Sequence, residues 1–109
     1  MSKLNGVVSH HEREMAELGY DRQLAVEYLK VAIESLDKPD DRAAGLLALR
    51  SVAEAYDGLA VVAAEAGISR ESLYRSLSAK GNPTLKTLVA VLKTLGLRLS
   101  VKAEDRVVA

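Results

Sequence analysis

The sequence predicts an all-α fold: a bundle of about five helices, followed by one short C-terminal β-strand. Apolar residues recur at intervals of three and four along most of the chain between residues 22 and 95, which is the spacing of one helix face. The 109 residues include 49% hydrophobic residues but no Phe and no Trp. The core must therefore consist of Leu, Val, Ile and Ala side chains, as in small helical bundles.

Residues 1–20 are expected to form a flexible tail or a short helix. Ser9 is followed three residues later by Glu12, which fits a capping box. His10 and His11 suggest a metal site, but adjacent residues point to different sides of a helix. The chain has no Cys and no further His to complete a ligand set. We therefore expect no metal.

Residues 21–57 are expected to form a helical pair that packs on or extends the core. Asp21 would cap a helix over about 22–36, with Leu24, Ala25, Tyr28, Leu29, Ala32, Ile33 and Leu36 directed inward. Pro39 would occupy the first turn of a helix over about 39–56, with an apolar stripe formed by Leu46, Leu49, Ala53 and Tyr56. Leu47 lies outside this stripe. The pair is therefore either core packing alone or also a docking surface for a partner.

Residues 58–77 read as two short helices. Leu59, Val62, Ala63 and Ala66 share one face of the first helix. Ser69 would cap the second, which would turn Leu73 and Leu77 inward. Gly67 lies between them and can adopt the positive φ that a sharp turn needs. Two helices joined by a short turn containing glycine form a helix-turn-helix.

Residues 78–83 form a polar loop, and Thr84 would cap a last helix over 85–95. The inward residues of that helix would be Leu85, Leu88, Val89, Leu92 and Leu95, and Gly96 would end it. Leu97 to Lys102 alternate between apolar and polar, which is the period of a half-buried strand. A lone strand cannot satisfy its backbone groups. Either the segment pairs with its copy in a second subunit, or it is an extended tail on the domain surface.

Charge divides the chain into two halves. The formal net charge is zero, but residues 1–57 hold seven Lys/Arg and eleven Asp/Glu, whereas residues 58–109 hold eight and four. Such asymmetry suggests two surfaces with different partners. The basic half contains the helix-turn-helix, which favours nucleic acid as its ligand, so residues 58–102 are expected to form a DNA-binding domain that includes the C-terminal strand.

The pattern of Ala63, Gly67, Ile68, Ser69 and Leu73 resembles phage-repressor-like (Xre/Cro-type) helix-turn-helix domains. The longer run GISRESLYRSLSAKGNPTLKTLVAVLKTLGLRLSV is similar to the antidotes (type II antitoxins) of bacterial addiction modules. The resemblance covers the last half of the chain closely and the part from Leu24 more loosely. It implies a lambda-repressor-like fold, an operator in double-stranded DNA, a homodimer, autorepression, and a cognate toxin of the RelE/ParE type. Pairing of the Leu97–Lys102 strands is one route to that dimer, and the surface tail is the alternative.

In a helix-turn-helix the second helix enters the major groove with its first residues against base edges. By the resemblance, the base-contacting positions are Ser69, Arg70, Glu71 and Arg75. Arginine can donate two hydrogen bonds to guanine, and glutamate can accept one from cytosine. Contacts to the DNA backbone are expected from Ser72, Tyr74, Lys80, Asn82 and Lys86. Ser76 departs from the repressor pattern, which has a large apolar residue there. The alternative is a solvated face with an ion pair between Glu71 and Arg75.

Several classes of protein are not expected. No run of about 18 apolar residues occurs, so we expect no membrane span. The first residues lack the pattern of a secretory signal, so we expect a cytoplasmic protein. Neither a cofactor nor an enzyme is expected, because no phosphate-binding loop or catalytic constellation is present. A plain repressor without a toxin and a helical protein–protein adaptor are the alternative functions.

Overall fold

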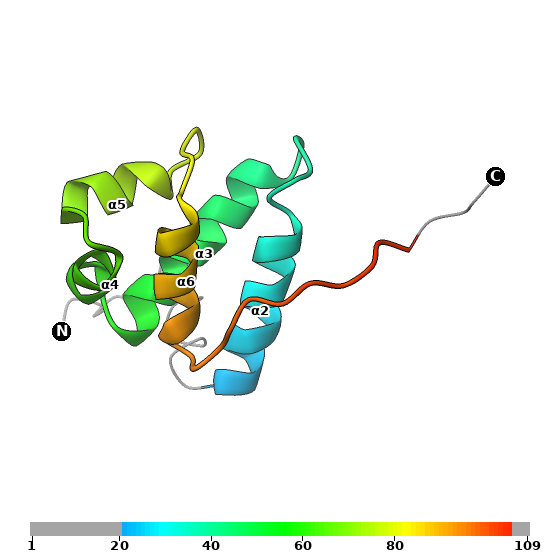
Figure 1. Ribbon diagram of the computed structural model, residues 1–109, viewed down its shortest axis with the longest axis horizontal. Coiled ribbons are helices and arrows are strands. Elements are labelled where there is room, and N and C mark those ends of the chain that lie inside the picture. Colours follow the sequence, from blue (N-terminus) through cyan, green and yellow to red (C-terminus); the bar gives the residue numbers. More distant parts are fainter. Residues whose placement is uncertain (1–20, 106–109) are drawn as a thin grey trace, which may run out of the picture.

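The computed structural model describes residues 21–105, and this part of the chain is all-helical, with five helices and no strand (Figure 1). The helices are α2 (Arg22–Glu34), α3 (Arg42–Tyr56), α4 (Leu59–Ala66), α5 (Arg70–Ser76) and α6 (Leu85–Lys93). The tail or short helix expected for residues 1–20 lies outside the described residues. None of the helices between residues 21 and 105 has the length and apolar character that crossing a membrane requires.

Three helices begin at the capping residues that the sequence predicts. The side chain of Asp21 accepts a hydrogen bond from the amide of Leu24 at the start of α2. Ser69 caps α5 through the amide of Ser72, and Thr84 caps α6 in the same way. Each cap supplies an acceptor to an amide that has no partner within its own helix.

The start of α3 differs from the prediction, because this helix begins at Arg42 rather than near Pro39. Residues 38–41 form a turn that the amide of Asp41 closes by donating to the carbonyl of Lys38 at 2.9 Å. Pro39 is the second residue of that turn, a position that its fixed φ favours. The proline therefore belongs to the turn between two helices and not to a helical first turn.

The core lies where α3 meets α2 on one side and α4 and α6 on the other. Leu29, Leu46, Leu49, Leu73 and Leu77 are completely buried there, as the sequence predicts. Two inward assignments are wrong.

Leu24 is 43% exposed and Leu85 is 66% exposed. Both lie in the first turn of a helix. The buried face of α6 centres on Thr87 and Val91, one turn apart, which directs Leu85 away from the core.

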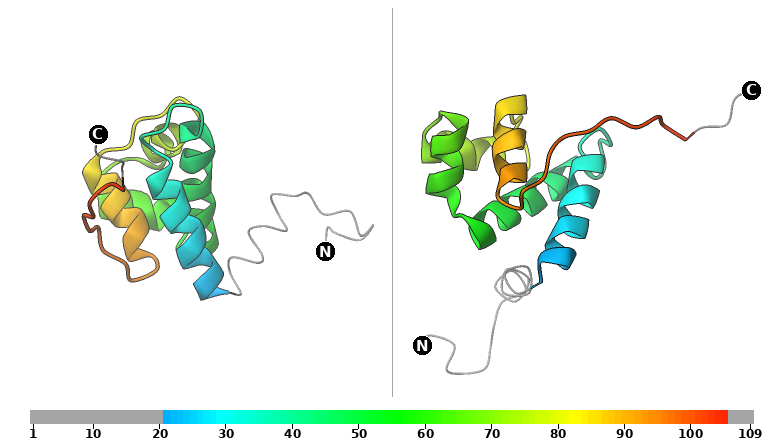
Figure 2. Two further views of the ribbon diagram at one scale, coloured as in Figure 1. Left: turned by 90° about the vertical axis from the view of Figure 1, so that its right-hand side faces the viewer. Right: turned by 60° about the horizontal axis from the view of Figure 1, so that its bottom comes forward.

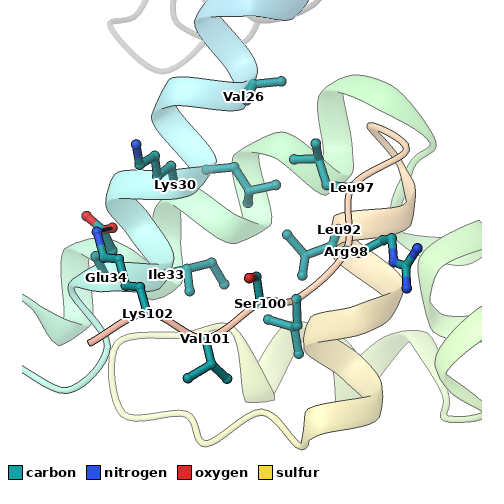
Figure 3. Close-up of a pocket in the computed structure, with 12 residues that line it drawn as sticks. Val26, Lys30, Ile33, Glu34, Leu92, Leu97, Arg98, Ser100, Val101 and Lys102 are labelled. Atoms are coloured by element: carbon teal, nitrogen blue, oxygen red, sulfur yellow. Dashed lines mark hydrogen bonds and ion pairs between the residues drawn. The ribbon is translucent and has the colours of Figure 1, made fainter. Parts of the chain in front are cut away.

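The expected strand over Leu97–Lys102 is wrong for the single chain. Residues 97–105, here called the C-terminal arm, leave α6 without regular structure and cross α2 (Figures 1 and 2). Leu97 and Leu99 line a cavity of about 380 Å³ together with Val26 and Ile33 of α2 (Figure 3). The arm is thus an extended tail on the surface, because no neighbouring strand edge exists among the described residues.

One ion pair fastens the far part of the arm to α2. The Lys102 ammonium lies 2.9 Å from the Glu34 carboxylate (Figure 3), and both side chains are well exposed. This contact lowers the pKa of Glu34, first through the hydrogen bond from Lys102 and then through its charge. The positive charges of Lys30 and Lys38 act in the same direction.

Candidate nucleic-acid interface

A left-handed glycine sets the angle between α4 and α5. Gly67 has a φ of 74°, and its amide and that of Ile68 donate to the carbonyls of Ala64 and Ala63. These bonds close the end of α4 and turn the chain sharply into α5. The sequence predicts this turn, because a residue with a Cβ resists that backbone conformation.

The rotation of α5 follows from its two buried leucines. Leu73 and Leu77 are one turn apart and face α4 and the core, with no exposed surface. Arg70, Glu71 and Arg75 lie on the rest of the helix and are exposed. The side of α5 that the sequence assigns to bases is thus the side that faces away from the protein.

The hydroxyls at the start of α5 bond to one another. Ser69 accepts from the Ser72 amide at 3.0 Å, and its own hydroxyl donates to the Ser72 hydroxyl oxygen at 3.0 Å. Arg75 donates to that same oxygen at 3.3 Å. In the described part of the chain, Arg75 makes this bond in place of the ion pair with Glu71 that the alternative interpretation expects.

Tyr74 lies under an arginine of another helix. The guanidinium carbon of Arg50, on α3, is 4.5 Å from the centre of the Tyr74 ring, and the tyrosine is half exposed. Beside this pair, Glu54, Leu59, Arg70 and Glu71 complete a shallow cavity of about 220 Å³ with Tyr74. Sequence reasoning missed Arg50, because it lies far from α5 along the chain and its helix shows no motif.

Basic and polar residues flank α5 at both ends. Lys80 and Asn82 are exposed in the loop that follows the helix. The ammonium of Lys86 lies beside the turn that precedes α5, 3.0 Å from where a Cβ on Gly67 would be. The structure thus brings all the sequence-predicted site residues to α5, its two flanking turns or the first turn of α6.

A further arginine touches this surface from α3. Arg42 donates to the side-chain oxygen of Asn82 at 3.1 Å. Neither the spacing nor the composition of the sequence indicates this contact. Among residues 21–105, no group of three or more His, Cys, Asp or Glu side chains is placed to hold a metal ion. His10 and His11 lie outside the described residues.

Comparison with known proteins gives two matches. A family model described as "Probable addiction module antidote protein" matches residues 10–103. An uncharacterized protein of Haemophilus influenzae is 46% identical over 57 residues, which are 52% of this chain and 58% of that protein. The chain thus matches less than two thirds of that relative's length. No solved structure matches the chain.

Proposed function

The chain belongs to the family of probable addiction module antidote proteins, and from this premise we propose that it is a DNA-binding antitoxin that represses its own operon. In this proposal α4 and α5 form a phage-repressor-like helix-turn-helix, and α5 is the helix that reads the major groove. The observation that carries the proposal is the rotation of α5. Its leucines are buried while Arg70 and Arg75 face outward.

Base recognition is assigned to the exposed residues of α5. Arg70 and Arg75 would each donate to the two acceptors of a guanine, and Glu71 would accept from a cytosine amine. The hydroxyl of Ser69 lies next to them at the helix start and would contact an adjacent base. These contacts would determine which operator sequence is bound.

Contacts to the DNA backbone are assigned to the residues around α5. Lys80 and Asn82 follow the helix, Lys86 lies beside the preceding turn, and Ser72 and Tyr74 lie on the helix itself. Contacts to phosphate fix the register of the protein on the duplex, and they make affinity fall as salt rises. A homodimer would place two copies of α5 in successive major grooves, on half-sites about 34 Å apart.

The family implies a cognate toxin, and we assign its docking to the outward face of α2. Leu24 and Val31 are seven residues apart on that face, and they are 43% and 61% exposed. Residues 21–57 hold five Lys/Arg and eight Asp/Glu, so the helical pair complements a basic toxin of the RelE/ParE type. In Figure 1 α2 lies across the molecule from α5, and a toxin on its outward face would leave α5 free for DNA.

The proposal is tested with the full chain and the product of the adjacent gene. The two proteins are co-expressed and purified, and binding to a fragment of their own promoter is measured with and without the second protein. A stable complex and salt-dependent promoter binding are expected. Promoter binding without any complex would indicate a plain repressor, whereas a complex without DNA affinity would indicate a protein–protein adaptor.

A further inference from the structure

Arg42 joins two turns that are distant in the sequence. It is the first residue of α3, and its Nη1 donates to the carbonyl oxygen of Leu36 at 3.0 Å. Its Nη2 donates to the carbonyl oxygen of Gly81 and to Oδ1 of Asn82, each at 3.1 Å. One guanidinium thus connects the end of α2 with the loop that follows α5.

The other side of that loop is held by close backbone packing. A Cβ built on Gly81 would lie 2.1 Å from the carbonyl oxygen of Ser76 and 2.5 Å from that of Arg75. The loop therefore passes directly against the end of α5, which only a glycine permits. Arg42 and this contact together fix where Asn82 stands relative to α5.

The contact with Arg42 also determines which way the Asn82 amide points. A guanidinium carries only donors, so the group that faces it must be the amide oxygen. The amide nitrogen, with two N–H donors, is then directed away from Arg42. Asn82 is exposed, so these donors are available to an acceptor in solution. The reverse orientation would present an oxygen, which a phosphate would repel.

We propose that Arg42 is a positioning residue for DNA binding. It orients the Asn82 amide and its loop so that the amide nitrogen donates to a backbone phosphate while α5 lies in the groove. Arg42 itself need not touch the DNA. This inference rests on the proposed function, since it assumes that Asn82 meets a phosphate.

The test is a double-mutant cycle in promoter affinity, measured on the full chain. Arg42→Lys keeps the positive charge, but a single ammonium cannot replace the fork that reaches three acceptors. We expect Asn82→Ala and Arg42→Lys each to weaken binding by roughly tenfold to a hundredfold, the size of one hydrogen bond to a charged group. The double variant should bind no more weakly than Asn82→Ala alone. Arg98→Lys, on the exposed C-terminal arm, is the matched control and should bind like the wild type.

The inference would be overturned if Arg42→Lys lowered promoter affinity equally in the wild-type and in the Asn82→Ala backgrounds. Arg42 would then act through stability or charge alone. Asn82→Asp provides a second readout that does not depend on how Arg42→Lys folds. It keeps an acceptor for Arg42 but replaces the donors with a negative charge, so it should weaken DNA binding without lowering the urea midpoint. Wild-type affinity in Asn82→Asp would also overturn the inference.

Variants of the α5 arginines distinguish a failure of this inference from a failure of the proposed function. If Arg70→Ala abolishes promoter preference but the Arg42–Asn82 cycle is additive, only the positioning role is wrong. If the wild-type chain has no affinity for its promoter, the proposed function and this inference both fail.

Discussion

Arg50 of α3 stacks on the ring of Tyr74 of α5, with 4.5 Å between the guanidinium carbon and the ring centre. The pair joins the helix assigned to the DNA groove to the central helix of the bundle. Because the cation lies over the ring face, the interaction is electrostatic as well as apolar. It holds α5 at a second point besides its buried leucines.

The stacking should appear as a coupling energy of about 0.5–1 kcal/mol between Arg50→Met and Tyr74→Ala. Unfolding in urea of the wild type, the two single variants and the double variant gives this value. Tyr74→Phe keeps the ring and should keep the wild-type midpoint. Additive effects of the two changes would show that Arg50 and Tyr74 do not interact in solution. If Tyr74→Phe weakens promoter binding at unchanged stability, its hydroxyl contacts the DNA backbone.

The arginines of α5 should control sequence preference. Arg70→Ala or Arg75→Ala should each reduce the free energy of binding to the operator by about 1–3 kcal/mol, with little effect on binding to unrelated DNA. Lys80→Ala should weaken binding to the operator and to unrelated DNA by similar factors. It should also reduce the salt dependence of binding by about one phosphate contact. Gel shifts with operator and scrambled fragments over a range of KCl concentrations measure both effects. Operator binding that is unchanged in both arginine variants would refute the assignment of α5.

Gly81→Ala should be more destabilising than Gly67→Ala. At Gly81 the new methyl group meets backbone atoms of α5 at 2.1 Å, which cannot move without displacing the helix end. We expect such overpacking to lower the free energy of unfolding by about 3 kcal/mol. At Gly67 the nearby atom is the flexible end of Lys86, so the cost is mainly the left-handed backbone, about 1–2 kcal/mol. Urea midpoints in the opposite order would show that the loop does not press against α5.

The attachment of the C-terminal arm should depend on pH. The pKa of Glu34 is lowered in the folded chain by its hydrogen bond to Lys102, so the ion pair contributes fully above the unfolded pKa of the carboxyl. This contribution is lost as pH falls through the folded pKa. Because both side chains are exposed, high salt should weaken the pair as well. Amide chemical shifts of residues 100–102 should follow the Glu34 titration, and Glu34→Gln should remove that dependence.

Features set by local chemistry could be predicted from the sequence. Ser69 and Thr84 cap their helices because a hydroxyl before a helical run has amides within reach. Gly67 ends α4 at a positive φ, and Gly96 adopts another in the turn that follows α6, a conformation that few other residues adopt. The outward face of α5 also followed, because Leu73 and Leu77 fix the rotation of a short helix.

Features set by distant partners could not be predicted. Arg42 meets Asn82, and Arg50 meets Tyr74, only after the bundle has formed, and no spacing in the chain marks either pair. Periodicity defined the faces of α2 and α6, but their packing partners left Leu24 and Leu85 outside. The alternation after Gly96 indicated a strand, although the described chain contains no edge for it to join.

The opposite placement of α2 and α5 has an electrical consequence. Residues 21–57 carry five Lys/Arg and eight Asp/Glu, whereas residues 58–96, which precede the C-terminal arm, carry five and two. With α4 to α6 on one side of the molecule and α2 on the other (Figure 1), a chain of zero net charge possesses a molecular dipole moment. A nearby polyanion exerts a torque on such a molecule and turns its basic end forward before contact.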